Sequence, residues 1–136
     1  MSYGYFSNDE LEYIIDRPFD PPRAQLNFLW NDRLISGLNQ FGTGEGVFNG
    51  RVMLYNDAQG RVLLNQNGAR YIYIKDRKSG DTWNLGNYPI KKAVENQYCH
   101  IGLGYSRFQL EYGGIHSMAK AFIDHREPVE IWEIEF

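Results

Sequence analysis

The chain has 136 residues, a formal net charge of −3 and an aromatic content of 15%. This length suffices for one ordinary domain with a buried core, and the scattered Lys and Arg residues offer no basic patch to nucleic acid or to an anionic membrane surface. No apolar stretch is as long as the about 20 residues that a membrane span needs, and the N-terminal residues lack the pattern of a secretory signal. The single cysteine, Cys99, excludes an intrachain disulfide and is typical of a reducing compartment, so we expect a cytoplasmic protein.

The first predicted elements are two short strands separated by a proline-rich connector. Residues 11–16 and 25–30 alternate apolar and polar side chains, which favours strands. Residues 17–23 between them contain three of the five prolines, which excludes both a helix and a central strand. We therefore expect an extended connector there.

A glycine-dense segment, residues 42–50 (GTGEGVFNG), lies between two further predicted strands at 33–41 and 51–55. Its beginning is similar to a phosphate-cradling loop, but the Lys-Ser/Thr pair of such loops is absent and no predicted helix follows. The glycines therefore predict a loop or a bulge.

The clearest hairpin lies in the middle of the chain. Residues 70–76 form its first strand, residues 77–80 its turn and residues 81–85 its returning strand. Tyr71 and Tyr73 share one face of the first strand, and two isoleucines share the other. Because both faces are apolar, we expect this strand to be internal to a sandwich.

The last third of the chain carries the most regular strand patterns. Residues 106–112 alternate cleanly and direct three side chains inward, namely Phe108, Leu110 and Tyr112. Residues 115–124 have a face of small side chains that suits close approach of two sheets, and residues 129–136 form the closing strand. Nine or ten strands and no substantial helix predict an all-β antiparallel β-sandwich.

Few side chains are spaced for catalysis or metal binding. The three histidines lack the spacing of metal ligands, so we expect no metal and no cofactor. Cys99 and His100 are neighbours on a strand and point to opposite faces, so Cys99 is expected to be buried and inert. Six carboxylates fall on predicted solvent faces, and no catalytic residue is expected among them: Asp9, Glu10, Glu111, Glu130, Glu133 and Glu135.

The aromatic surplus permits two interpretations. Aromatic rings fill the interiors of β-sandwiches, and their planar faces also stack on sugar rings. The core is the default assignment. The candidates for an exposed carbohydrate-binding platform are Trp30, Trp83, Tyr71 and Tyr73.

Four motifs, taken together and in order, resemble one enzyme family. They are YGYFSNDELEYIIDRPFDPP (3–22), GARYIYIKDRKSGDTWN (68–84), CHIGLGYSRFQLEYGGIHS (99–117) and EPVEIWEIEF (127–136). Their succession is similar to that of the inverting glycoside phosphorylases of glycoside hydrolase family 94. These are the enzymes of the cellobiose and chitobiose phosphorylase type, formerly classed as glycosyltransferase family 36.

The resemblance implies that residues 1–136 are the first part of an N-terminal supersandwich domain of a larger carbohydrate-active enzyme. In that family an α/α barrel, beyond a helical linker, carries the general-acid aspartate and the phosphate site. The parent enzyme would cleave β-glucosidic di- or oligosaccharides with phosphate, and this chain would act as scaffold and dimer surface. The implied partners are carbohydrate or the rest of the parent enzyme, and a second copy paired along the C-terminal edge strand.

Two alternatives to this interpretation stay open. The chain could be a free-standing carbohydrate-binding β-sandwich, or an interaction module without a ligand. Binding of gluco-oligosaccharides distinguishes the first of these from the scaffold interpretation.

Overall fold

The computed structural model describes residues 2–52 and 70–136, and the described residues form twelve strands and no α-helix. All paired strands are antiparallel, which confirms the predicted all-β antiparallel class. No described segment forms a helix that could cross a membrane. In chain order the strands are β1 (Gly4–Phe6), β2 (Glu12–Ile15), β3 (Asn27–Trp30), β4 (Leu34–Leu38), β5 (Gly44–Phe48), β6 (Arg51–Val52), β7 (Tyr73–Lys75), β8 (Thr82–Asn84), β9 (Asn96–Gly102), β10 (Tyr105–Tyr112), β11 (Ile115–Ile123) and β12 (Glu130–Glu135).

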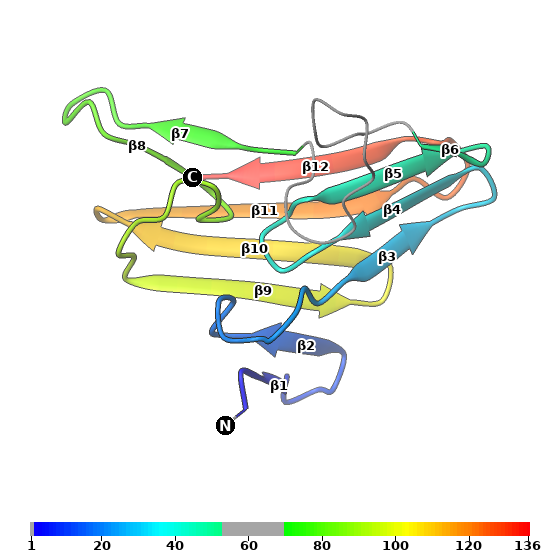
Figure 1. Ribbon diagram of the computed structural model, residues 1–136, viewed down its shortest axis with the longest axis horizontal. Coiled ribbons are helices and arrows are strands. Elements are labelled where there is room, and N and C mark those ends of the chain that lie inside the picture. Colours follow the sequence, from blue (N-terminus) through cyan, green and yellow to red (C-terminus); the bar gives the residue numbers. More distant parts are fainter. Residues whose placement is uncertain (1, 53–69) are drawn as a thin grey trace.

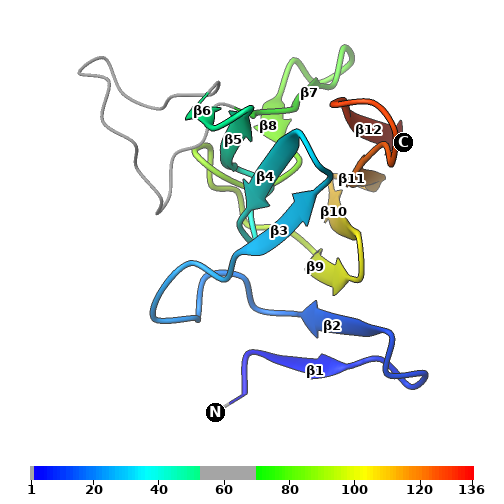
Figure 2. The same cartoon turned by 90° about the vertical axis from the view of Figure 1, so that its right-hand side faces the viewer.

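The strands form one large sheet and two small ones (Figure 1). The large sheet has six strands in the order β1-β2-β9-β10-β11-β12, and β12 is one of its edges. The four-stranded sheet β3-β4-β5-β6 and the β7-β8 hairpin lie on one side of it (Figure 2). The proline-rich connector between β2 and β3 forms neither helix nor strand, as predicted.

The core lies between these layers. It joins buried side chains of the large sheet to Leu29 on β3, Leu38 on β4 and Leu85 after β8. On the large sheet most of the predicted inward positions of β10 and β11 are buried, because side chains at every second position face the same layer, whereas Tyr112, Ile115 and Ile123 are half-buried. These buried residues are Phe108, Leu110, Ser117, Ala119 and Ala121.

The glycine-dense segment is mainly a strand, so the predicted loop is wrong. Residues 44–48 form β5, and a tight turn at Asn49 and Gly50, both with positive φ (46° and 74°), leads into β6. Asn-Gly is the preferred pair for such hairpin turns. Gly44 serves close approach: a Cβ there would lie 1.7 Å from the carbonyl oxygen of Gly37 on β4. Of the strand predicted at 51–55, residues 53–55 lie outside the described residues.

The central hairpin is confirmed, but its first strand is not internal to the sandwich. Among the described strands β7 pairs with β8 alone, and Gly80 in the turn between them has a φ of 77°. Ile72 and Ile74 pack against the core, whereas the Tyr73 side chain is 52% exposed. The hairpin is an outer layer, so its tyrosine face has no sheet above it among the described residues.

Candidate functional site

The structure does not gather the predicted aromatic platform into one surface. Trp83 is only 2% exposed and packs edge-to-face on Tyr112, with ring centroids 5.2 Å apart, which excludes it from an exposed platform. Trp30 is 71% exposed on β3. The ring centroids of Tyr71 and Tyr73 lie 6.1 Å apart. Tyr73 begins β7 and Tyr71 comes just before it, and β7 lies well away from β3 in both views (Figures 1 and 2).

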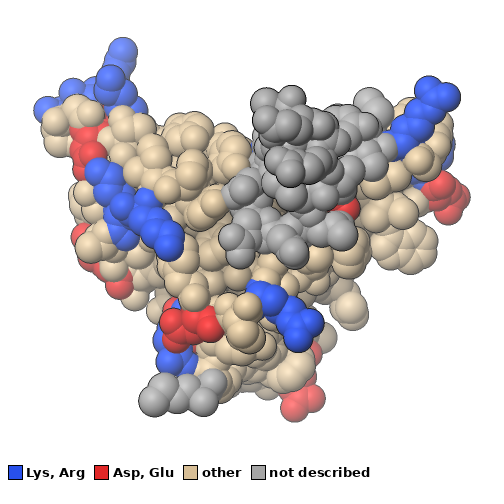
Figure 3. Space-filling view, viewed as in Figure 1, with Lys and Arg blue, Asp and Glu red and all other residues tan. Residues whose placement is uncertain are grey.

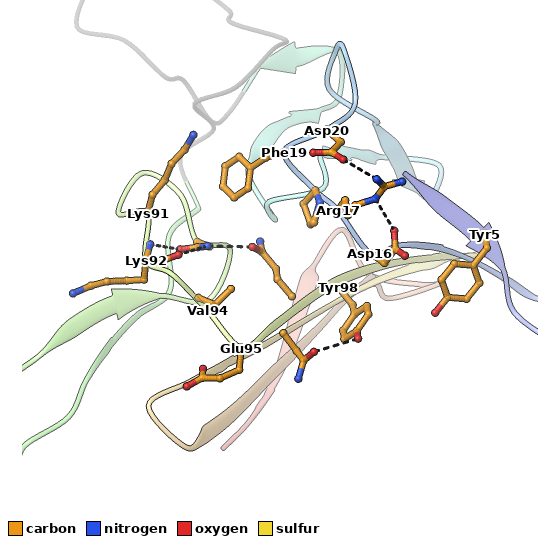
Figure 4. Close-up of a pocket in the computed structure, with 14 residues that line it drawn as sticks. Tyr5, Asp16, Arg17, Phe19, Asp20, Lys91, Lys92, Val94, Glu95 and Tyr98 are labelled. Atoms are coloured by element: carbon orange, nitrogen blue, oxygen red, sulfur yellow. Dashed lines mark hydrogen bonds and ion pairs between the residues drawn. The ribbon is translucent and has the colours of Figure 1, made fainter. Parts of the chain in front are cut away.

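A cavity of about 620 Å³ lies instead beside the proline-rich connector. Figure 4 shows the residues that line it. Three stretches of the chain line it: β1, the connector after β2, and the continuous segment that runs from the loop after β8 into the start of β9. None of the four predicted platform residues contributes to it.

Charges in this cavity are balanced and largely paired. Arg17 contacts Asp16 at 3.8 Å and Asp20 at 3.2 Å, all on the connector (Figure 4). On the opposite wall Lys92 binds Asp81 at 2.6 Å. The Lys92 ammonium and the Tyr112 hydroxyl hold the pKa of the Asp81 carboxyl at about 2. The visible surface as a whole also mixes acidic and basic side chains (Figure 3).

Side-chain amides fix the wall formed by the loop after β8. Asn87 accepts a hydrogen bond from the backbone N–H of Lys92 (2.7 Å) and donates to the backbone oxygen of Lys92 (3.2 Å) and to Gln97 (3.2 Å). Gln97 in turn donates to the carbonyl oxygen of Gly86 (3.0 Å). This loop is thereby tied to β9 by several hydrogen bonds.

A second hollow, of about 220 Å³, adjoins the first and is more aromatic. The two cavities share Pro18, Phe19 and Lys91. The Phe19 ring contacts the Phe41 ring at 4.8 Å, and the Lys91 ammonium lies 4.2 Å from the Phe19 ring centre. Phe19 therefore presents an apolar ridge between the two hollows.

Sequence reasoning missed a polar cluster on the other face of the large sheet, centred on Glu12. Its carboxylate accepts hydrogen bonds from Tyr105 (2.5 Å) and Arg107 (2.9 Å) and contacts the imidazole of His100 (2.8 Å). Burial raises the pKa of Glu12, but these bonds and the Arg107 charge outweigh burial and lower the pKa below its ordinary value. Cross-strand pairing of β2, β9 and β10, which short-range patterns do not reveal, assembles the cluster.

Cys99 behaves as predicted. It is 1% exposed, and burial raises the pKa of its thiol to about 12. His100, its neighbour, takes part in the Glu12 cluster on the opposite face of the sheet. Among the described residues no group of three or more His, Cys, Asp or Glu side chains could hold a metal ion.

The structure corrects the prediction that Glu130 faces solvent. Arg70 binds its carboxylate through two nitrogens, at 2.5 and 2.7 Å, and Trp132 (2.6 Å) and Ser36 donate to it as well. Burial raises the pKa of Glu130, but Arg70 and the other donors outweigh it, so the pKa is lowered. One signal could have found this: Glu130 has the same parity along β12 as Trp132, whose ring stacks on core residue Phe108.

Comparisons with known proteins identify relatives of this fold and place its motifs in a family. Residues 11–136 match the profile of the glycosyl hydrolase 94 supersandwich domain. The chain is 40% identical to solabiose phosphorylase of Paenibacillus borealis, over 97% of this chain and 17% of that protein. It is 33% identical to N,N'-diacetylchitobiose phosphorylase of Vibrio proteolyticus, over 98% of this chain and 17% of that protein.

A further relative is the 3-O-beta-D-glucopyranosyl-beta-D-glucuronide phosphorylase of Paenibacillus borealis, 32% identical over 98% of this chain and 16% of that protein. The chain thus spans about one sixth of the length of the curated relatives that it matches. Because the family profile covers more than nine tenths of the residues, in agreement with the motif succession and the all-β fold, the chain belongs to the glycosyl hydrolase 94 supersandwich domain family.

Proposed function

We propose that this chain is the β-sandwich scaffold of a glycoside phosphorylase, an enzyme that cleaves β-glucosidic di- or oligosaccharides with inorganic phosphate. Three relatives with different named substrates share this one region along nearly all of its length, which supports a common structural role. The chemistry of cleavage would belong to other parts of the parent enzyme.

The family match over residues 11–136 carries this proposal, and the state of the carboxyl groups supports it. A general acid for glycoside cleavage needs a raised pKa, so that it holds its proton at neutral pH. Among the described residues, every carboxyl group with a shifted pKa is shifted downward, because each accepts hydrogen bonds or lies beside a cation. These groups are Asp9, Glu12, Asp76, Asp81, Asp124 and Glu130. They are suited to holding the fold and not to protonating a leaving group.

A domain exchange tests the scaffold role. The matching region of the Paenibacillus borealis solabiose phosphorylase is replaced by this chain, and phosphate consumption with solabiose is measured. We expect the chimera to fold and to consume phosphate, and the isolated 136-residue chain to consume none. Turnover by the isolated chain, or a folded chimera without activity, would refute the proposal.

As the second part of the proposal, the free edge of β12 is a dimer surface that pairs with a second copy of the chain. β12 pairs with β11 along one edge, and no described strand pairs with its other edge. Ile134 and Phe136 there are 42% and 74% exposed. An exposed apolar edge strand is a template for pairing with another chain.

Light scattering during size-exclusion chromatography, over a range of concentrations, tests this pairing. We expect dimers that Ile134→Lys weakens, because a lysine on an edge strand opposes strand pairing. Ile35→Lys is the matched control, since Ile35 on β4 is 46% exposed and lies in the other sheet. A monomer at every concentration, or equal effects of the two variants, would contradict the dimer surface.

A further inference from the structure

We propose that the 620 Å³ cavity beside the connector is a binding site for an uncharged oligosaccharide, an inference that rests on the proposed role in a glycoside phosphorylase. The volume falls within the about 300–1,000 Å³ typical of small-molecule sites. A cavity of this size holds a few sugar rings. The site differs from the aromatic platform that the sequence predicts.

The charge balance of the lining selects the class of ligand. The lining contains three carboxylates (Asp16, Asp20 and Glu95) and three cations (Arg17, Lys91 and Lys92), so it has no net charge. Arg17 and Lys92 are already paired with carboxylates. A phosphate or another anion would meet three like charges, and among the lining cations only Lys91, which lies 4.2 Å from the Phe19 ring centre, has no described carboxylate partner. A neutral ligand avoids this cost.

The hydrogen-bonding groups suit hydroxyls in particular. A sugar hydroxyl donates one hydrogen bond and accepts others, so it needs both kinds of partner within reach. The cavity offers acceptors on its carboxylates and donors on its cations, and the amides of Asn96 and Gln97, which already donate to Glu111 and to Gly86, each keep a second N–H. These groups come from opposite walls, as Figure 4 shows for Asp20 on the connector and Glu95 before β9.

Aromatic rings complete the site. Tyr5 on β1 is 50% exposed and Phe19 on the connector is 42% exposed, and both line the cavity together with Tyr98 on β9. Ring faces of this kind pack on the apolar faces of sugar rings. Because the amides of Asn87 and Gln97 fix the loop wall, little ordering entropy is lost when a ligand binds.

Binding to the 136-residue chain is measured by NMR titration with cellotriose, with chitotriose and with inorganic phosphate. We expect one or both trisaccharides to shift the resonances of cavity residues, and phosphate to leave them in place. Tyr5→Ala is expected to weaken trisaccharide binding about tenfold, the loss of one stacking contact. Asp20→Asn, at an exposed side chain, is expected to weaken it as well without unfolding the chain.

Tyr73→Ala is the matched control, because Tyr73 is also a strand tyrosine and is 52% exposed, but lies outside the cavity. It is expected to leave the affinity unchanged, as is Trp30→Ala. Absence of binding by both trisaccharides, equal losses in Tyr5→Ala and Tyr73→Ala, or binding of phosphate in their place would overturn the proposal. An active domain-exchange chimera, together with no saccharide binding by the 136-residue chain, would overturn the cavity site alone and leave the scaffold role intact.

Discussion

Glu12 and Glu130 have similar partners but connect different parts of the fold. Each carboxylate binds an arginine and an aromatic donor, and each has a lowered pKa. The partners of Glu12 lie on neighbouring strands of the large sheet. The partners of Glu130 include Ser36 on β4 of the other sheet and Arg70 before β7. The Glu130 cluster therefore couples the layers, whereas the Glu12 cluster reinforces a ladder that backbone hydrogen bonds already hold.

The surroundings of the two arginines also differ. The Arg70 side chain is 11% exposed, and that of Arg107 is 30% exposed. If its carboxylate is removed, Arg107 can turn towards water, but Arg70 keeps an uncompensated charge between the sheets. Similar hydrogen bonds should thus contribute different amounts to stability.

Glu130→Ala is expected to have the largest effect. It should lower the free energy of unfolding by about 3–5 kcal/mol, because it leaves Arg70 buried and unpaired. Urea unfolding followed by circular dichroism measures this. The control is Glu133→Ala, an exposed glutamate on the same strand, with an expected change within about 0.5 kcal/mol. Equal losses in the two variants would show that Glu130 does not couple the layers.

Glu12→Ala is expected to cost less, about 1–3 kcal/mol, in the same unfolding experiment. Its donors lose their acceptor, but the backbone pairing of β2 with β9 persists. Glu135→Ala, at an exposed position of β12, should be nearly neutral. A loss for Glu12→Ala as large as that for Glu130→Ala would remove the contrast between the two clusters.

Acid should weaken both clusters in the same direction. The folded-state pKa of each glutamate lies below its unfolded value, so the stabilisation is present above the ordinary glutamate pKa and is lost as the pH falls through the folded-state value. We expect the free energy of unfolding to decrease on acidification below about pH 4.3. The decrease should be shallower in Glu130→Gln, which cannot titrate. An unchanged pH slope in Glu130→Gln would contradict the lowered pKa.

The smallest expected difference compares one hydroxyl from each cluster. Ser36→Ala removes a fully buried donor to Glu130, and Tyr105→Phe removes a partly exposed donor to Glu12. Each should cost about 0.5–1.5 kcal/mol, with Ser36→Ala at the upper end. Thermal unfolding of the two variants in parallel shows which substitution lowers the stability more. A larger loss in Tyr105→Phe would contradict the expectation that the more buried hydroxyl contributes more.

Local patterns predict much of this fold, because strand alternation and turn residues act over a few positions. The alternation of Phe108 and Leu110, and the small side chains at Ala119 and Ala121, correctly indicate the core face. The loop predicted around Gly44 is wrong because Gly44 serves the close approach of β4, which is visible only in three dimensions.

The sites depend on longer-range pairing and were less predictable. Glu130 meets a partner 60 positions away in the sequence, so its burial could not follow from its neighbours alone. Trp83 and Trp30 are both strand tryptophans, yet one is buried and the other exposed, because only one faces the second layer. The cavity combines three separate stretches of the chain, and no short motif indicates it.

The order of residues in the Glu130 cluster has a consequence for biosynthesis. Ser36 and Arg70 leave the ribosome well before Glu130, the acceptor that both require. Until then the guanidinium has no Glu130 carboxylate to pair with, and this contact between the layers cannot form. We therefore expect a nascent chain arrested before β12 to be more sensitive to protease than one released after it.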